Sequence, residues 1–130
     1  MTDNLVGNHT LADGVSAEVR DTTSHYFGGY YHVRLDVRAE IRLQSCWFED
    51  LLTFGQACKC LGDSVYFKRT LEKMAVPEAE IEDVRLKLLD TFEKNMLVYL
   101  LRPDFPRRFA RGEYVKALGS IRPKRTYHHG

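Results

Sequence analysis

The sequence predicts an α+β protein in which helices cover one face of an antiparallel sheet. From Tyr31 to Leu43, apolar and polar residues alternate without a break. A helix repeats about every 3.6 residues, so this alternation indicates an extended strand. A shorter alternating run covers Gly14 to Asp21, and the apolar spacing becomes helical after Cys46. The two runs predict a long hairpin, and the later segments predict the helices that cover its apolar face.

The hairpin is expected to have one buried and one solvated face. In the first strand Val15, Ala17 and Val19 share one side, and in the second every apolar residue from Tyr31 onward does so. The polar positions of the second strand mostly alternate in sign, which favours a solvated face with cross-strand ion pairs. About ten residues join the two strands, so a long tip is expected.

The segment after Cys46 predicts the first helix. Glu49 and Asp50 fit its first turn, where the helix dipole favours acids, and Gly62 can end it. Its apolar stripe is formed by Trp47, Leu51, Phe54, Cys58 and Leu61. The segment from Ser64 to Lys73 fits a strand or a helix by periodicity. Its content of Val, Tyr, Phe and Thr favours a third strand.

The strongest helical pattern opens at Pro77, because proline is tolerated at the first helical position. Its apolar stripe is Ile81, Val84, Leu88, Phe92 and Tyr99. The stripes that contain Leu51 and Leu88 are the expected cover of the sheet. The last turns before Arg102 are apolar nearly all round, which predicts burial between layers or against a partner. Beyond Pro103, only one short helix around Gly112 to Leu118 is expected.

The chain has 130 residues, a length that favours a single domain. We expect a mobile leader over residues 1–10, one α+β domain over 11–118, and a flexible basic tail over 119–130. The longest apolar run, Met96 to Leu101, is far shorter than the roughly 20 residues of a membrane span. The polar N-terminus lacks a signal peptide, and the three cysteines form no even set for disulfides. These features predict a cytoplasmic protein that does not enter a membrane.

Charge is unevenly distributed along a chain whose net charge is +1. The segment 102–130 carries +6 and the remainder −5. Aromatic residues are interleaved with the basic ones, a pattern that resembles a generic nucleic-acid footprint. The candidate nucleic-acid residues are Arg107, Arg108, Arg111, Lys116, Arg122, Lys124 and Arg125.

The stretch HYFGGYYH at the hairpin tip is the candidate ligand or partner surface. Its paired glycines mark a chain reversal, and Tyr and His are common at binding surfaces. The proposed surface residues are His25, Tyr26, Tyr30 and His32. The favoured interpretation of the loop is nevertheless structural, with Tyr26 and Phe27 folded back over one end of the sheet, and binding is the alternative to it.

Metal binding and catalysis are disfavoured by the spacing of the residues that would perform them. Cys46, Cys58 and Cys60 could join His25 or His32 around an ion, but structural zinc sites favour two C-x2-C knuckles. The sequence CKC instead sets its two thiols about 200° apart on a helix. No nucleophile elbow, phosphate loop or zinc-protease motif is present. We therefore predict no metal, no cofactor and no catalytic residue.

Three stretches carry a resemblance: VRDTTSHYFGGYYHVRLDV, VYFKRTLEKMAVPEAEIEDVR and YLLRPDFPRRF. Together they resemble small bacterial proteins of unassigned function, over roughly Leu11 to Phe109. The resemblance implies a stand-alone bacterial domain and no particular activity.

The preferred functional prediction is a non-enzymatic interaction or regulatory module that self-associates or binds a protein partner. The long second strand and the apolar helix end are expected to leave an edge and a patch for a second copy. The alternative is a nucleic-acid-binding accessory protein that uses the basic C-terminal segment. A third possibility is an enzyme with a site near the His/Tyr-rich loop.

Overall fold

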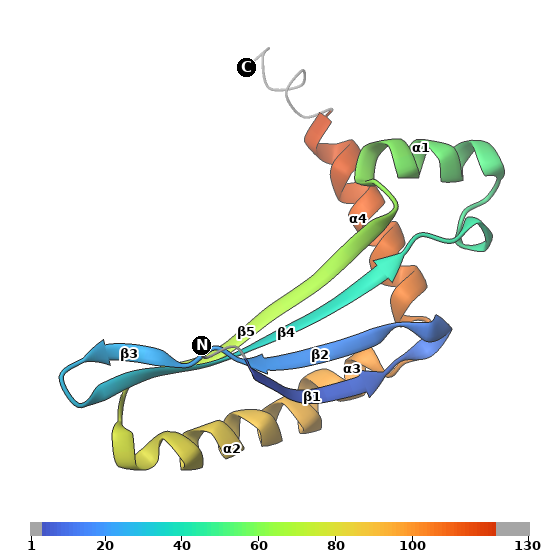
Figure 1. Cartoon of the computed structure of the whole chain (residues 1–130). Helices are drawn as coiled ribbons and strands as arrows, with labels where there is room; N and C mark the ends of the chain where they lie inside the picture. The colour runs from blue at the N-terminus through green and yellow to red at the C-terminus, as the bar shows by residue number, and fades with distance from the viewer. Residues whose placement is uncertain (1–3, 122–130) are drawn as a thin grey trace.

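Five antiparallel strands form one open sheet, and helices cover one of its faces (Figure 1). The computed structural model describes residues 4–121. The strands are β1 (Asn4–Thr10), β2 (Ser16–Asp21), β3 (Ser24–Phe27), β4 (Tyr30–Arg42) and β5 (Ser64–Pro77). The helices are α1 (Leu51–Leu61), α2 (Ile81–Thr91), α3 (Leu97–Leu100) and α4 (Phe105–Ile121). The α+β class, the antiparallel sheet and the third strand over Ser64 to Lys73 are confirmed.

Strand β4 is the centre of the sheet. Strand β5 pairs with one of its edges from Tyr30 to Arg42, while β2 and then β3 share the other edge. The alternation predicted for this strand is confirmed, because Val33, Leu35, Val37, Ala39 and Ile41 are all at most 1% exposed. The free edges of the described sheet therefore belong to β1, β3 and β5. The prediction that the long second strand supplies a free edge is wrong.

Two strands lie where the sequence predicted none. The leader expected over residues 1–10 instead contains β1, which pairs with β2 from Asn4↔Asp21 to Thr10↔Ser16. The long hairpin tip contains β3, which pairs with the beginning of β4. Both depend on pairing with a stronger neighbour, because neither has a clear alternating pattern of its own.

Helix α1 begins later than predicted. Asp50 is its N-cap and accepts a hydrogen bond from the Thr53 N–H at 2.8 Å, which lowers the pKa of the carboxyl. Trp47 precedes the helix in a 3-10 turn, where it is buried. Phe54, Cys58 and Leu61 of the predicted stripe pack against the core, whereas Leu51 is 75% exposed and does not take part in the cover. Gly62, with φ of 84°, closes the helix as predicted.

Two other helix boundaries differ from prediction. Pro77 ends β5, and a 3-10 turn (Glu78–Glu80) separates it from α2. Helix α4 runs from Phe105 to Ile121, much longer than the short helix expected around Gly112 to Leu118. A π-helical turn (Phe92–Met96) joins α2 to α3.

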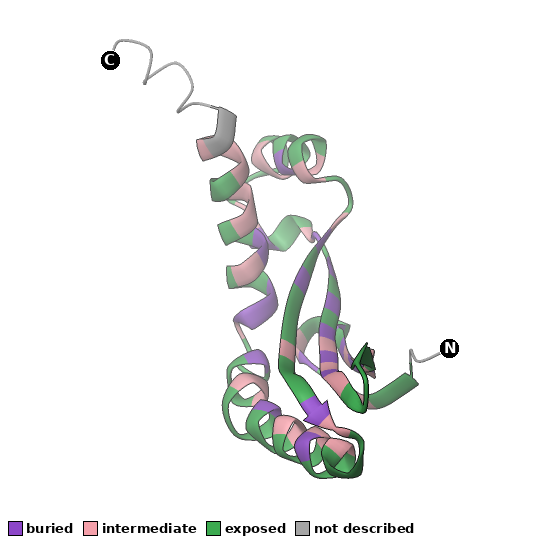
Figure 2. Cartoon of the chain, turned by 90° about the vertical axis from the view of Figure 1, so that its left-hand side faces the viewer, coloured by how far each residue is buried: buried purple, intermediate pink, exposed green. Residues whose placement is uncertain are grey.

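The helices cover different parts of the sheet, as the burial pattern shows (Figure 2). Val84 of α2 packs against Val33 and Val76 near the β3 end. Phe105 and Phe109 of α4 contact the Phe67 ring edge-on, with centroids 5.6 Å away. The apolar end of the α2–α3 segment is only partly covered, since Val98 is 62% exposed. Leu100 is fully buried and Met96 and Leu97 pack against the core, so burial between layers is confirmed for this side of the segment, and burial of the other side against a partner stays a prediction.

A bulge in β5 holds a strained residue. Tyr31 pairs with Val76 and Val33 with Lys73, so β5 has one residue more than β4 here. Ala75 in this bulge has φ of 55°. A Cβ costs about 1–2 kcal/mol in the left-handed region, although glycine loses more chain entropy on folding.

Replacing Ala75 with glycine should therefore stabilise the fold by about 0.5–1 kcal/mol in urea unfolding. Ala117→Gly in α4 is the control and should destabilise by about 1 kcal/mol. A loss of stability in Ala75→Gly would show that the backbone at Ala75 is not strained.

Candidate functional site

The β3–β4 hairpin projects past the end of α2, at the opposite end of the molecule from α1 (Figure 1). Its tip exposes three aromatic side chains: Tyr26 is 52% exposed, Phe27 73% and Tyr30 47%. We call these three residues the hairpin-end surface. The structural interpretation favoured by the sequence, in which Tyr26 and Phe27 fold back over the sheet, is wrong, because both side chains are exposed. Exposed rings grouped in this way are typical of binding surfaces.

The tip is held by a short turn and by His25. Phe27 pairs with Tyr30, so Gly28 and Gly29 alone form the turn. Gly28 has φ of 55°, a conformation that a side chain would strain. The His25 Nε2–H donates to the Gly28 carbonyl at 2.5 Å, and the His25 ring contacts the Tyr31 ring edge-on. These contacts give the exposed aromatic residues a defined scaffold.

The structure does not bring the four predicted surface residues together. Tyr26 and Tyr30 lie at the tip, as expected. His25 instead bonds to its own turn, and it lines a cavity beside α2. His32 lies further along β4, where its Nε2 is 2.6 Å from Glu72 Oε1. The histidines therefore support the hairpin, and the aromatic rings form its exposed end.

Phe27 is the most exposed member of the surface and was missing from the predicted set. The sequence signal for it was available, because Phe27 directly precedes the glycine pair. A large apolar residue next to a tight turn has few neighbours that can bury it.

Acidic residues flank the hairpin-end surface. The Glu78 N–H donates to the Gly29 carbonyl at 3.2 Å, which brings the start of the 3-10 turn against the tip. The Glu78 and Glu80 side chains are both exposed. This end of the molecule thus combines aromatic rings with negative charge.

A buried ion pair ties α2 to the sheet behind the hairpin. Asp21 is 6% exposed, and its Oδ1 accepts the Thr23 N–H at 2.9 Å. Arg85 Nε lies 2.8 Å from Asp21 Oδ2, and Arg85 Nη1 also contacts Glu82. A cavity of about 470 Å³ adjoins the pair and is lined in addition by Asn4, Thr23, Ser24, His25, Tyr31 and Ile81. Because the Asp21 carboxylate and the Arg85 guanidinium already have partners, the pair is a structural tie rather than a free reactive group.

The Asp21–Arg85 pair was missed, although half of it had a sequence signal. Asp21 continues the row of Val15, Ala17 and Val19 on the buried side of its strand. A carboxylate in such a position requires a cation or several donors. Its partner lies far along the chain, and nothing local identifies Arg85.

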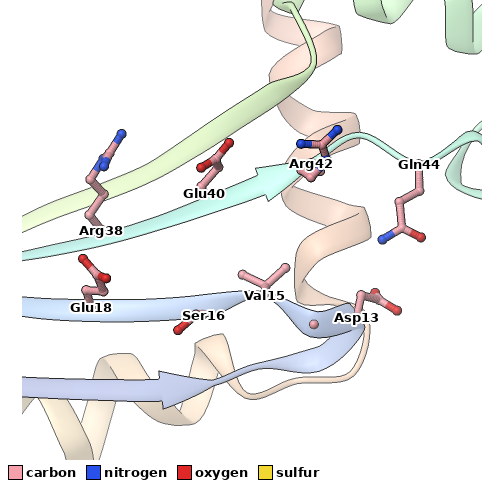
Figure 3. A pocket seen from close by; sticks show the side chains of 9 residues that line it. Asp13, Val15, Ser16, Glu18, Arg38, Glu40, Arg42 and Gln44 are labelled. Carbon is pink, nitrogen blue, oxygen red and sulfur yellow. The ribbon is translucent and has the colours of Figure 1, made fainter.

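The solvated face of the sheet carries a groove between β2 and β4, about 410 Å³ in volume (Figure 3). Arg38, Glu40 and Arg42 line it from β4, and Ser16 and Glu18 from β2. Asp13 and Gln44 complete its open end. The groove contains charges of both signs and no histidine or cysteine, so it lacks a side chain that ordinarily titrates near neutral pH.

The cysteines lie apart from the hairpin. Cys46 and Cys60 are exposed, Cys58 is half-buried, and all three are free thiols. Within residues 4–121, no three His, Cys, Asp or Glu side chains form a group that could hold a metal ion.

The basic residues of α4 are partly neutralised. Arg107, Arg108 and Arg111 line one open cavity together with Asp104. Arg108 pairs with Asp104 at 3.5 Å, and Lys116 pairs with Glu113 at 3.0 Å. Arg122, Lys124 and Arg125, also predicted for nucleic acid, lie outside the described residues.

Comparison of the chain with protein-family models, curated proteins and solved structures gave no match. None of the helices in the described part of the chain is long and apolar enough to cross a membrane.

Proposed function

We propose that this chain is a cytoplasmic, non-enzymatic interaction module that binds an arginine-rich segment of a partner protein on its hairpin-end surface. The observation that carries the proposal is the exposure of Tyr26, Phe27 and Tyr30 at the tip of a braced hairpin. Aromatic rings that are already ordered lose little conformational entropy on binding. The two-residue turn and the His25 hydrogen bond order the backbone that carries these rings.

The chemistry of the partner follows from the charge around the rings. Glu78 and Glu80 lie beside the tip, and the rings offer faces on which a guanidinium can stack. Arginine satisfies both, because it pairs with carboxylates and packs flat against tyrosine and phenylalanine. An acidic segment would meet like charge at the same place.

The test is titration of the isotope-labelled protein with two synthetic peptides, one of alternating arginine and glycine and one of alternating glutamate and glycine. The arginine peptide should shift the amide NMR signals of residues 26–30 and 78–80 in a saturable way. Phe27→Ala should weaken this binding about tenfold, which corresponds to about 1.4 kcal/mol.

Leu51→Ala is the matched control, because Leu51 is as exposed as Phe27 and lies on α1 at the far end of the molecule. It should leave the affinity unchanged. Equal shifts with the glutamate peptide, no saturable shift with the arginine peptide, or no effect of Phe27→Ala would each overturn the proposal.

A further inference from the structure

We propose that the free edge of β5 pairs with β5 of a second copy, in the one register that places Thr70 opposite the partner's Thr70. The two sheets would join into one continuous antiparallel sheet with both helix layers on the same face. This proposal concerns the edge strand β5 and does not depend on the hairpin-end surface. It can therefore fail or succeed separately from the function proposed above.

The free edge of β5 is accessible to a second strand between Lys68 and Lys73. Strand β5 pairs only with β4 among the described strands. Between Lys68 and Lys73, every residue is exposed except Leu71, which is half-buried. Neighbouring residues of a strand point to opposite faces, so exposure at consecutive positions means that the helices leave both faces of this segment largely open, with Leu71 alone packed against the core. Toward the start of β5, Phe67 is only 2% exposed because α4 packs over it.

Symmetry limits how two copies of β5 can pair. Two identical adjacent antiparallel strands are related by a twofold axis perpendicular to the sheet, which leaves each side chain on its own face. Directly opposed residues must lie on the same face, so the axis passes through a residue pair and never between two pairs. Each possible register is thus named by the residue that faces its own copy.

Only one of these registers within the open segment avoids opposing like charges. Centred on Thr70, it places Lys68 opposite the partner's Glu72, and Glu72 opposite the partner's Lys68. Opposite charges directly across strands stabilise a sheet, and like charges destabilise it. Every other centre between residues 68 and 73 creates a clash: Lys68 on Lys68, Arg69 on Arg69, Arg69 on Lys73, Glu72 on Glu72, or Lys73 on Lys73.

The neighbouring side chains and the ends of the regular edge also agree with the register centred on Thr70. Arg69 faces the partner's Leu71 on the helix side, and its guanidinium already lies over the Phe67 ring, 4.6 Å from the centroid. Glu72 is half-exposed beside His32, which leaves its carboxylate accessible to a second cation. The bulge at Ala75 and the following Pro77 end the regular edge and prevent a slide of the pairing toward the tip. Charged residues and a bulge normally prevent a free strand edge from pairing with another chain. In β5 they exclude every register except the one centred on Thr70.

Disulfide trapping tests the register in a full-length background of Cys46→Ser, Cys58→Ala and Cys60→Ser, checked for folding by circular dichroism. In it, Thr70→Cys should form a covalent dimer under mild oxidation, because opposed Cα atoms in a sheet lie within the range for a disulfide. Lys68→Cys is the control. In the proposed register the two copies of residue 68 are four positions apart, about 13 Å, and cannot bond.

Charge exchange provides a second readout in the wild-type cysteine background. Lys68→Glu should weaken dimerisation at least tenfold in analytical ultracentrifugation, and Lys68→Glu combined with Glu72→Lys should restore it. Equal trapping of Thr70→Cys and Lys68→Cys, absence of trapping in Thr70→Cys, a strict monomer at millimolar concentration, or failure of the double variant to recover would each overturn the proposal. Peptide binding at residues 26–30 would be unaffected by these results.

Discussion

Replacement of Phe105 with alanine is expected to lower the free energy of unfolding by about 3–5 kcal/mol. Phe105 is 2% exposed and contacts three rings, those of Phe67, Tyr99 and Phe109, at centroid distances of 5.3–5.7 Å. Its removal leaves a cavity between α4 and the sheet that these rigid neighbours cannot fill by small movements. The loss is large relative to the 5–15 kcal/mol by which domains are usually stable.

Equilibrium urea unfolding, followed by circular dichroism, measures this loss. Val115→Ala in the same helix is the control, since Val115 is 64% exposed and should change stability by less than about 0.5 kcal/mol. Amide exchange should also show that α4 loses protection first in Phe105→Ala. Equal effects of the two substitutions would show that α4 is not anchored through Phe105.

Arg85→Met is the second substitution with a large expected effect, a loss of about 3 kcal/mol. It leaves the Asp21 carboxylate buried with the Thr23 N–H as its only donor among the described residues. Removal of one partner from a buried pair typically costs about 3–5 kcal/mol, and the lower end applies because Arg85 keeps some contact with solvent. The double variant Arg85→Met with Asp21→Asn should recover much of the loss, because it removes the unpaired charge.

Glu82→Gln separates the buried contact of Arg85 from its exposed one. The Glu82 side chain is 70% exposed, so its loss should cost less than about 1 kcal/mol in the same unfolding measurement. A loss in Arg85→Met no greater than that in Glu82→Gln would contradict the importance of the Asp21 contact.

The sequence predicted the structure best where the pattern within a single element is enough to show which of its residues are buried or form a turn. Strand β4 is buried on one face from Val33 to Ile41, so its period appears directly in the residue order. The glycine pair likewise identified the reversal at the tip, because Gly28 adopts a positive φ. In both cases the structural requirement falls on consecutive residues.

Elements that depend on a distant partner were missed. Strand β1 contains Asn4, Gly7 and Asn8, which have low strand propensity, and it is held by pairing with β2. Helix α4 contains Pro106, Gly112 and Gly119, which have low helix propensity, so the sequence did not predict its full length. The helix forms because it packs on Phe67 and α1. The candidate site was predicted only in part for the same reason. The rings of the tip follow from local sequence, whereas the acids beside them depend on the contact of Glu78 with Gly29.

The π-helical turn between α2 and α3 absorbs one extra residue without rotating the following helix away from the core. Phe92 and Leu97 are five residues apart, yet both pack on the same core. A π-turn has the effect of one inserted residue, and each residue of a helix rotates the chain by about 100°. Glu93, Lys94 and Asn95 are exposed and can accept many other side chains. Deletion of any one of them would restore a regular helix and leave Leu97 and Leu100 on the core face, because the turn absorbs the extra residue. This segment should therefore tolerate the loss of one residue as well as substitution.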